Sequence, residues 1–259
     1  MSNLGQESIR RVFTEVFSAR DIAEPLVSFD AAISSEQLTT LVQQQTFEVI
    51  GVRRDGLVVG YAKCDSAANE TELPVSNFEE AQLIRDSAPL SEVVIRLQSE
   101  PRLFVTMLGT VAGIITKTDL QKPAVRMWLF GLVTLIEMRF TRMIGRVCPS
   151  ESWKEFLSPG RIQKAESLQA ERARRGQRVD LIDCLQFSDK GTIFARNSEL
   201  RDLTVFQSRR QLEEAFKGVE RLRNNLAHSQ DIISGDWNII IGMTENLERI
   251  IQGPQIVED

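Results

Sequence analysis

The first half of the chain contains an internal repeat of strand-forming segments, whose glycines Gly60 and Gly113 coincide at an offset of 53 positions. Each copy has two β-rich apolar runs separated by a short segment, which is the pattern of a β-hairpin. The runs occupy residues 47–52 and 56–60 in the first copy and 102–106 and 109–113 in the second. A segment with apolar residues at helical spacing precedes each hairpin, at 34–45 and at 90–97. The sequence therefore predicts a helix–strand–strand unit that occurs twice.

The second half of the chain has almost no strand signal and instead places apolar residues at helical spacing. The segments with this pattern are 124–146, 152–175, 208–227 and 237–251, and a short apolar segment lies at 181–187. Pro123 stands at the start of the first segment, where proline is tolerated. Four or five helices without strands favour an antiparallel bundle. We therefore predict an α+β domain at 1–122 and an all-α domain at 123–259.

The composition is that of an ordinary globular protein in a reducing compartment. The hydrophobic fraction of 42% and the charged fraction of 26% suffice for buried cores and do not indicate disorder. The cysteines Cys64, Cys148 and Cys184 lie far apart, which predicts free thiols and argues against a disulfide framework or a zinc site. The longest apolar run, 127–138, already contains a glutamate and is shorter than the roughly 20 residues of a membrane helix. Because the N-terminus also has no apolar signal segment, we expect a cytoplasmic protein that does not span a membrane.

The segment 113–120, Gly-Ile-Ile-Thr-Lys-Thr-Asp-Leu, is the most informative part of the first half. With it, residues 22–122 resemble a tandem pair of CBS domains. In that family, a hydrophobic residue followed by Thr-x-x-Asp binds adenosyl nucleotides, with the aspartate on the ribose hydroxyls and the threonine near the phosphate. The resemblance implies that Thr116 and Asp119 bind a regulatory adenine nucleotide, namely ATP, ADP, AMP or S-adenosylmethionine. Lys63 and Ser66 stand at the corresponding positions of the first repeat, so we expect one site per chain.

The residue types at 116 and 119 suit this ligand and also suit a simpler role. A carboxylate can accept both hydroxyl donors of a ribose, while a hydroxyl and a helix N-terminus suit an anion. The alternative is that Thr116 and Asp119 only cap the helix that follows, and the two roles are compatible. The sequence has no P-loop, and its paired glycines lack the third glycine and the strand-to-helix setting of a dinucleotide fingerprint.

The only histidine of the chain, His228, closes the run 223–228, Arg-Asn-Asn-Leu-Ala-His, at the end of the predicted helix 208–227. A bundle whose penultimate helix ends in this run resembles a HEPN domain, and the resemblance covers residues 124–252. In the ribonuclease branch of that family the signature is Arg, a polar residue, three variable residues and His. The resemblance implies that Arg223, Asn224 and His228 are catalytic, that RNA is the substrate and that two protomers share one active site. It also implies a role as a stress or antiviral toxin.

These residue types suit RNA cleavage without a metal ion. The reaction removes a proton from the ribose 2′-OH, gives one to the leaving 5′-oxygen and stabilises charge on the phosphate, which leaves a 2′,3′-cyclic phosphate. An imidazole can transfer the protons, and a guanidinium can hold phosphate oxygens in bidentate geometry. Because one histidine cannot do both proton steps at once, we expect a homodimer that brings two copies of His228 into one cleft. Residues five apart differ by about 140° around an ideal helix, so either the helix distorts or Arg223 and His228 approach the phosphate from different sides.

Three functions are compatible with the sequence. The first is an endoribonuclease regulated by a nucleotide, in which residues 120–123 link the nucleotide loop to the first helix of the bundle. The second is a non-catalytic nucleotide-sensing adaptor whose helical domain only dimerises, and the third is an RNA-binding protein that does not cut. The basic run 161–178 can guide an RNA backbone, although a solvated helix face is the commoner explanation. Glu137 either assists at the dimer cleft or pairs with Arg139 or Arg142.

Overall fold

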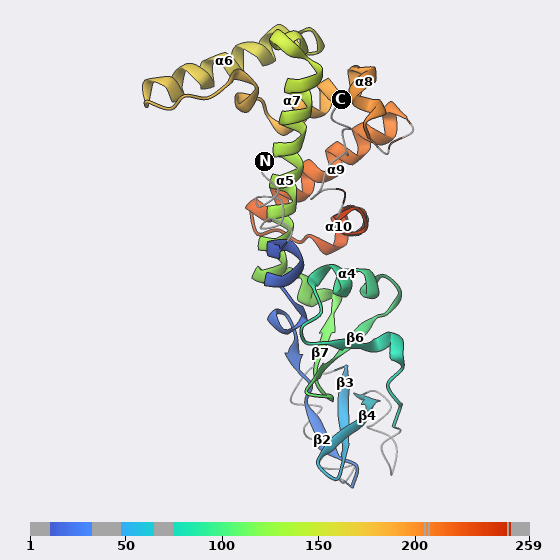
Figure 1. The fold of residues 1–259 in the computed structure, drawn as a ribbon. Coiled ribbons are helices and arrows are strands. Elements are labelled where there is room, and N and C mark those ends of the chain that lie inside the picture. The colour runs from blue at the N-terminus through green and yellow to red at the C-terminus, as the bar shows by residue number, and fades with distance from the viewer. Residues whose placement is uncertain are drawn as a thin grey trace. The chain divides into compact units, whose positions relative to one another are not determined.

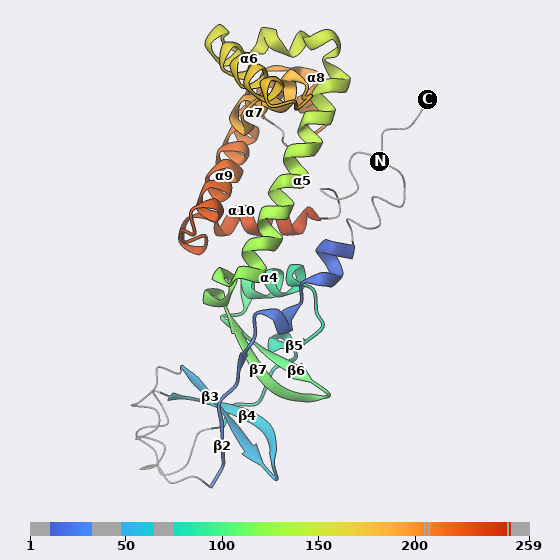
Figure 2. The same cartoon turned by 90° about the vertical axis from the view of Figure 1, so that its left-hand side faces the viewer.

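The computed structural model describes residues 11–32, 48–64, 75–204, 206, 208–247 and 249 (Figures 1 and 2). The chain forms two compact units, which divide between Arg126 and Met127, four positions after the predicted boundary. We call them the N-terminal unit and the helical unit and describe each by itself. The predicted helix at 34–45 lies outside the described residues.

The N-terminal unit contains two sheets that are built in the same way. Its described elements are η1 (Val12–Val16), η2 (Ala19–Asp21), β1 (Glu24–Pro25), β2 (Ser28–Asp30), β3 (Val49–Arg54), β4 (Leu57–Lys63), η3 (Glu80–Gln82), β5 (Leu83–Arg85), α4 (Leu90–Ser99), β6 (Arg102–Met107), β7 (Thr110–Thr116) and η4 (Lys117–Gln121). One sheet has the order β2-β3-β4 and the other β1-β7-β6-β5. In each sheet a parallel pair, β2–β3 or β5–β6, adjoins an antiparallel hairpin, β3–β4 or β6–β7.

The two predicted hairpins are confirmed, and they have the same register. Each hairpin has one shift of pairing and a two-residue turn at positive φ, as short hairpin turns require. The shifts lie at Val52/Arg53 and Val105/Thr106, and the turns are Asp55–Gly56 and Leu108–Gly109. Equivalent positions in the two hairpins are therefore 53 residues apart, the offset at which the glycines of the sequence coincide.

An aromatic cluster joins the two hairpins of the N-terminal unit. Phe104 of β6 is fully buried, and its ring lies 4.8 Å from that of Tyr61 on β4 and 4.6 Å from that of Phe78. Helix α4 buries Leu90, Leu97 and the two valines between them, and it packs on β6. Apolar residues at helical spacing thus form the helix face that covers the second sheet.

The helical unit has no strands among its described residues. Its elements are α5 (Pro123–Val147, shared with the end of the N-terminal unit), η5 (Pro149–Phe156), α6 (Pro159–Arg174), η6 (Leu181–Cys184), α7 (Phe187–Arg196), α8 (Ser198–Asp202), α9 (Arg209–Ala227) and α10 (Ile233–Glu245). Helix α10 lies across the end of α9, while α6 projects from the other helices (Figures 1 and 2). The predicted helices 124–146 and 208–227 are confirmed as α5 and α9.

Two predicted helices differ in their boundaries from the observed ones, and two further helices were not predicted. The predicted helix 152–175 is divided, because its first part forms the 3-10 turn η5 and α6 begins only at Pro159, where proline favours a helix start. Helices α7 and α8 were not predicted. Helix α10 begins at Ile233, four residues before the predicted start at 237.

A cluster of phenylalanines forms the centre of the helical unit. Phe140 of α5 lies 4.6 Å from Phe194 of α7 and 4.7 Å from Phe216 of α9, measured between ring centroids. Helix α7 can approach α9 closely because Gly191 has no side chain. A Cβ at this position would lie 2.7 Å from the ring of Phe216. The three cysteines are buried, and none of them forms a disulfide among the described residues. Burial, followed by the charges of nearby glutamates, raises the pKa of the Cys148 thiol.

In the part of the chain that the structure describes, every helix is too short or too polar to cross a lipid bilayer.

Candidate functional sites

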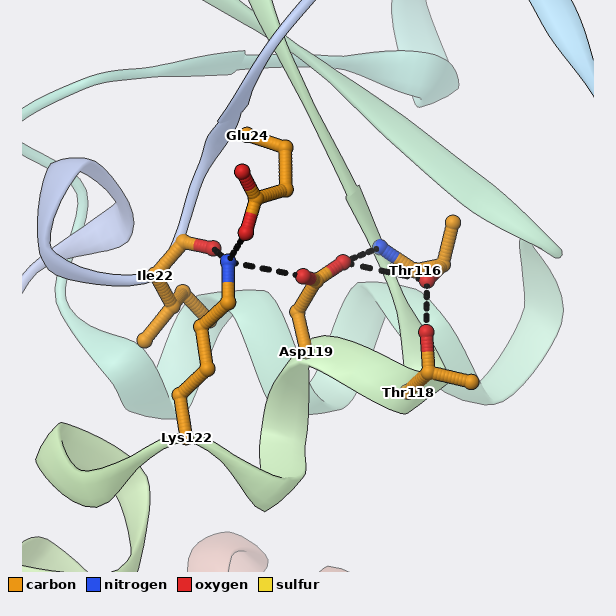
Figure 3. Close-up of polar contacts among 6 residues, drawn as sticks. All are labelled: Ile22, Glu24, Thr116, Thr118, Asp119 and Lys122. Carbon is orange, nitrogen blue, oxygen red and sulfur yellow. Dashed lines mark hydrogen bonds and ion pairs between the residues drawn. The ribbon is translucent and has the colours of Figure 1, made fainter. Parts of the chain in front are cut away.

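Thr116 and Asp119 lie together where β7 passes into η4 (Figure 3). Asp119 is buried, and its Oδ2 accepts hydrogen bonds from the backbone N–H of Thr116 at 2.7 Å and from the Thr116 hydroxyl at 3.0 Å. The Thr116 hydroxyl also lies 2.7 Å from that of Thr118, and either can be the donor. The capping role that the sequence left open is therefore observed.

The other oxygen of Asp119 contacts a cation that the sequence did not predict at this site. Lys122 Nζ lies 2.9 Å from Asp119 Oδ1, donates to the carbonyl oxygen of Ile22 at 2.6 Å and forms an ion pair with Glu24 (Figure 3). Desolvation disfavours the ammonium charge, but the hydrogen bonds and charges of Glu24 and Asp119 outweigh it, so the pKa of Lys122 is raised above the ordinary lysine value.

Strand pairing explains why Glu24 belongs to this cluster. Glu24 begins β1, and it lies opposite Ile114 of β7, two residues before Thr116. The strand β1 is far from β7 in sequence, and it has only two residues, so no periodicity marks it. No pattern in the sequence could have placed Glu24 beside Asp119.

The first repeat has no equivalent of this cluster among its described residues. Lys63 ends β4 as Thr116 ends β7, whereas Ser66 lies outside the described residues. The expectation of one site per chain stays a prediction.

The three residues of the histidine motif are exposed at the C-terminal end of α9. Arg223, Asn224 and His228 are all solvent-exposed, and none of their side chains has a hydrogen bond or ion pair among the described residues. The backbone N–H of His228 donates to the carbonyl oxygen of Asn224 at 3.0 Å, so the helical turn continues to His228. The helix does not distort before this point, so Arg223 and His228 lie on different sides of α9.

A buried aspartate fixes the end of α9 to the start of α10. Asp236 is fully buried, and its two carboxylate oxygens bind Arg221 Nε at 2.6 Å and Asn225 Nδ2 at 2.7 Å. Arg221 also donates to the carbonyl oxygen of Gly235 at 2.8 Å. Arg221 and Asn225 flank Arg223 and Asn224 in sequence, so the network holds the backbone that carries the motif. The motif pattern does not include Asp236, and its role follows only from the fold.

The structure corrects the predicted partners of Glu137. Glu137 neither pairs with Arg139 nor with Arg142; it accepts a hydrogen bond at 3.0 Å from Lys190 of α7, a buried lysine. A buried ammonium requires a counter-charge, so we interpret Glu137 as a structural partner within the unit. In α6 the basic residues of the run 161–178 are largely exposed and only Ala165 is buried, which matches the solvated-face explanation.

The helical unit also contains an apolar cavity of about 390 Å³ between α5, α9 and α10. Phe140, Met143, Phe216, Ile239 and Met243 are among its lining residues, and Arg223, Asn224 and His228 are not. Among the described residues, no group of three or more His, Cys, Asp or Glu side chains is arranged to hold a metal ion.

Comparison with known proteins gives similarities to solved structures only. No family model matches the chain, and no curated protein matches it. The CBS domain of the bacterial CNNM/CorC family Mg2+ transporter in complex with ATP is 18% identical, with a TM-score of 0.36, over 46% of this chain and 92% of that chain. CBSX2 in complex with AMP is 16% identical, with a TM-score of 0.36, over 43% and 98%. The CBS domains of a transcriptional regulator from Streptococcus pneumoniae are 15% identical, with a TM-score of 0.35, over 41% and 98%.

Proposed function

We propose that this protein is a metal-independent endoribonuclease that acts as a homodimer and is regulated by an adenine nucleotide. The observation that supports the catalytic part is the exposed end of α9, where Arg223, Asn224 and His228 have no partners among the described residues and Asp236 anchors the backbone beneath them. Side chains that bind a substrate must be accessible, while the backbone that carries them must be fixed.

In the proposed reaction, two protomers contribute to one cleft. One copy of His228 takes the proton of the ribose 2′-OH, and the copy of the other protomer gives a proton to the leaving 5′-oxygen. Arg223 holds the non-bridging phosphate oxygens as negative charge accumulates on them, and Asn224 donates a hydrogen bond to the same group. Because the helix is regular between residues 224 and 228, Asn224 and His228 lie on one side of α9 and Arg223 reaches the phosphate from another.

In the proposed regulation, an adenine nucleotide binds the N-terminal unit at Thr116 and Asp119. Among the residues that the structure describes, Asp119 Oδ1 contacts Lys122 only, so it can accept one more hydrogen bond. Its Oδ2 gains a free position when the Thr116 hydroxyl donates to Thr118 instead. ATP and AMP, which are bound in the CBS-domain structures named above, are the first nucleotides to test.

The decisive experiment is cleavage of total RNA by the purified protein in the presence of EDTA, followed by detection of 2′,3′-cyclic phosphate ends. His228→Ala is expected to lower cleavage at least about 100-fold, because it removes both proton-transfer groups of the shared cleft. Gln230→Ala, an exposed polar residue two positions later, is the matched control and should cut like the wild type. Equal cutting by wild type and His228→Ala, with both folded, would contradict the proposal.

The same experiment addresses the alternative of a non-catalytic adaptor. The apolar cavity between α5, α9 and α10 favours that alternative, because it can accept an apolar side chain of a protein partner and does not involve the motif. Absence of any new RNA ends would favour the adaptor, and salt-dependent RNA binding without cleavage would favour the third function, an RNA-binding protein.

A further inference from the structure

The carboxylates of Asp119 and Glu24 lie on either side of one ammonium group (Figure 3). Lys122 Nζ has three acceptors, namely the carbonyl oxygen of Ile22, Glu24 Oε1 and Asp119 Oδ1. Because an ammonium group has three N–H donors, this set satisfies it completely. Lys122 is therefore not free to bind a phosphate, and its role is to hold the two carboxylates at a fixed separation.

Each carboxylate keeps an acceptor position open beside the ammonium. Asp119 Oδ2 already accepts two hydrogen bonds from Thr116, whereas Asp119 Oδ1 accepts only from Lys122 among the described residues. Glu24 Oε1 likewise accepts only from Lys122 among these residues, and the Glu24 side chain is 59% exposed. Because a carboxylate oxygen can accept two hydrogen bonds, each of these two oxygens keeps one acceptor position.

The spacing of these acceptors suits neighbouring hydroxyls of a sugar. Glu24 Oε1 and Asp119 Oδ1 share Lys122 Nζ, and two oxygens that share one nitrogen at N···O lengths of ~2.9 Å lie roughly 4 to 5 Å apart. The adjacent 2′- and 3′-hydroxyls of a ribose are closer together than this, so each can donate outward to one of the two oxygens. The positive charge between the carboxylates also lowers the repulsion that a pair of acids would exert on a nucleotide phosphate.

The cap of η2 shows that this arrangement is not a general property of such turns. Asp21 Oδ2 accepts from the backbone N–H of Ser18 at 2.7 Å and from its hydroxyl at 3.0 Å, the same lengths as at Thr116 and Asp119. Among the described residues, Asp21 forms no ion pair with a lysine, whereas Asp119 does. The cluster at Asp119 therefore adds two residues that capping does not require.

We propose that Glu24 is a ligand of the nucleotide site and accepts one ribose hydroxyl while Asp119 accepts the other, with Lys122 fixing the distance between them. The inference rests on the proposed binding of an adenine nucleotide to this unit. On this inference, both carboxylates, and not Asp119 alone, make the site bind a ribonucleotide more tightly than a deoxynucleotide.

The test is calorimetric titration of the 259-residue chain with ATP, 2′-deoxy-ATP and 3′-deoxy-ATP. The wild type should bind ATP about tenfold more tightly than either deoxynucleotide, because each lacks one hydrogen bond to a charged acceptor. In Glu24→Ala the ratio of the affinity for ATP to the affinity for one deoxynucleotide should fall to about one. The same ratio for the other deoxynucleotide should stay at about ten, because Asp119 still accepts the other hydroxyl. Glu24→Gln keeps an acceptor oxygen, so it should keep part of the preference for ATP that Glu24→Ala loses.

Asp30→Ala is the matched control. Asp30 is an exposed carboxylate in the other sheet of the same unit and pairs with Arg53 at 3.2 Å, so its removal deletes the same charge and one ion pair outside the sheet that carries the site. Its three affinities should equal those of the wild type, and its melting temperature should match that of Glu24→Ala.

The failures are distinguishable. If Glu24→Ala keeps both ratios, or changes all three affinities by one factor, Glu24 does not accept a hydroxyl and the inference is overturned while nucleotide binding stands. If the folded wild type binds none of the three nucleotides, the proposed function of this unit is overturned and the inference with it.

Discussion

At the scale of single residues, Lys122 and Asp236 have similar structural roles in different units. Each binds two polar side chains next to a candidate site and holds them in place. Lys122 links a carboxylate at the end of β7 to one on β1. Asp236 links two side chains of α9 to the start of α10. Both residues lie outside the motifs that the sequence suggests, because their partners come close only when the chain folds.

We predict that Asp236→Asn weakens both the helical unit and the proposed cleavage. The substitution keeps the shape but removes the charge that faces Arg221, so the free energy of unfolding should fall by about 1 to 3 kcal/mol. Cleavage of RNA should fall as well, because the turn that carries His228 is no longer fixed. Urea unfolding and single-turnover cleavage measure the two effects.

Glu214→Gln serves as the control for Asp236→Asn, because it breaks an exposed ion pair with Arg210 on the same helix. It should leave stability and cleavage nearly unchanged. An Asp236→Asn protein that unfolds and cuts like this control would refute the anchoring role.

At the scale of elements, Gly60 and Gly113 are explained by neighbouring backbone that lies close to their Cα atoms, and not by the geometry of the hairpin turns. A Cβ at Gly60 would lie 2.5 Å from the carbonyl oxygen of Ser76, and a Cβ at Gly113 would lie 3.1 Å from that of Glu24. Both glycines sit at the same point of their hairpins, where another segment crosses the strand. In both copies of the repeat, the second strand of the hairpin therefore contains a glycine where another segment of the chain packs against it.

We predict that Gly60→Ala destabilises the N-terminal unit by about 2 kcal/mol or more, because a backbone oxygen cannot move away from the new methyl group as a side chain can. Gly113→Ala should cost less, since its contact is 3.1 Å long. Gly145→Ala, in helix α5 with no atom within 4 Å of the added Cβ, should instead stabilise the protein slightly. Denaturant melts of the three variants rank the effects, and an equal loss at Gly60 and Gly145 would contradict the argument.

The sequence predicted those elements whose signal is local. β-rich apolar runs separated by turns that contain Gly56 and Gly109 predicted both hairpins, and the apolar face of 208–227 predicted α9. Helices α7 and α8 were missed because their apolar residues are interrupted by Gly191 and Asn197, and both helices are short. Thr116 and Asp119 were placed together by their spacing, but Glu24 was not, because the pairing of β1 with β7 is tertiary. The catalytic role of His228 stays a prediction.

At the scale of the whole molecule, the proposed reaction requires two chains, so it can be tested by mixing them. Wild-type and His228→Ala protomers are combined in equal amounts and allowed to exchange. The reference is wild type at the same total protein concentration. If every active cleft needs both copies of His228, activity should fall to about a quarter of this reference, whereas independent sites would leave about half. Mixing wild type with Gln230→Ala should leave activity unchanged. A residual activity of one half would show that each protomer acts alone.

Helix α5 runs without interruption from Pro123 to Val147, and the division between the two units falls inside it, after Arg126. The residue before its first turn is Lys122, whose side chain is bonded to the cluster around Asp119. Helix α5 thus begins in the N-terminal unit, next to the residue that contacts Asp119, and continues as the first helix of the helical unit. We therefore predict that lengthening or breaking α5 near residue 127 removes the proposed effect of nucleotide binding on the helical unit.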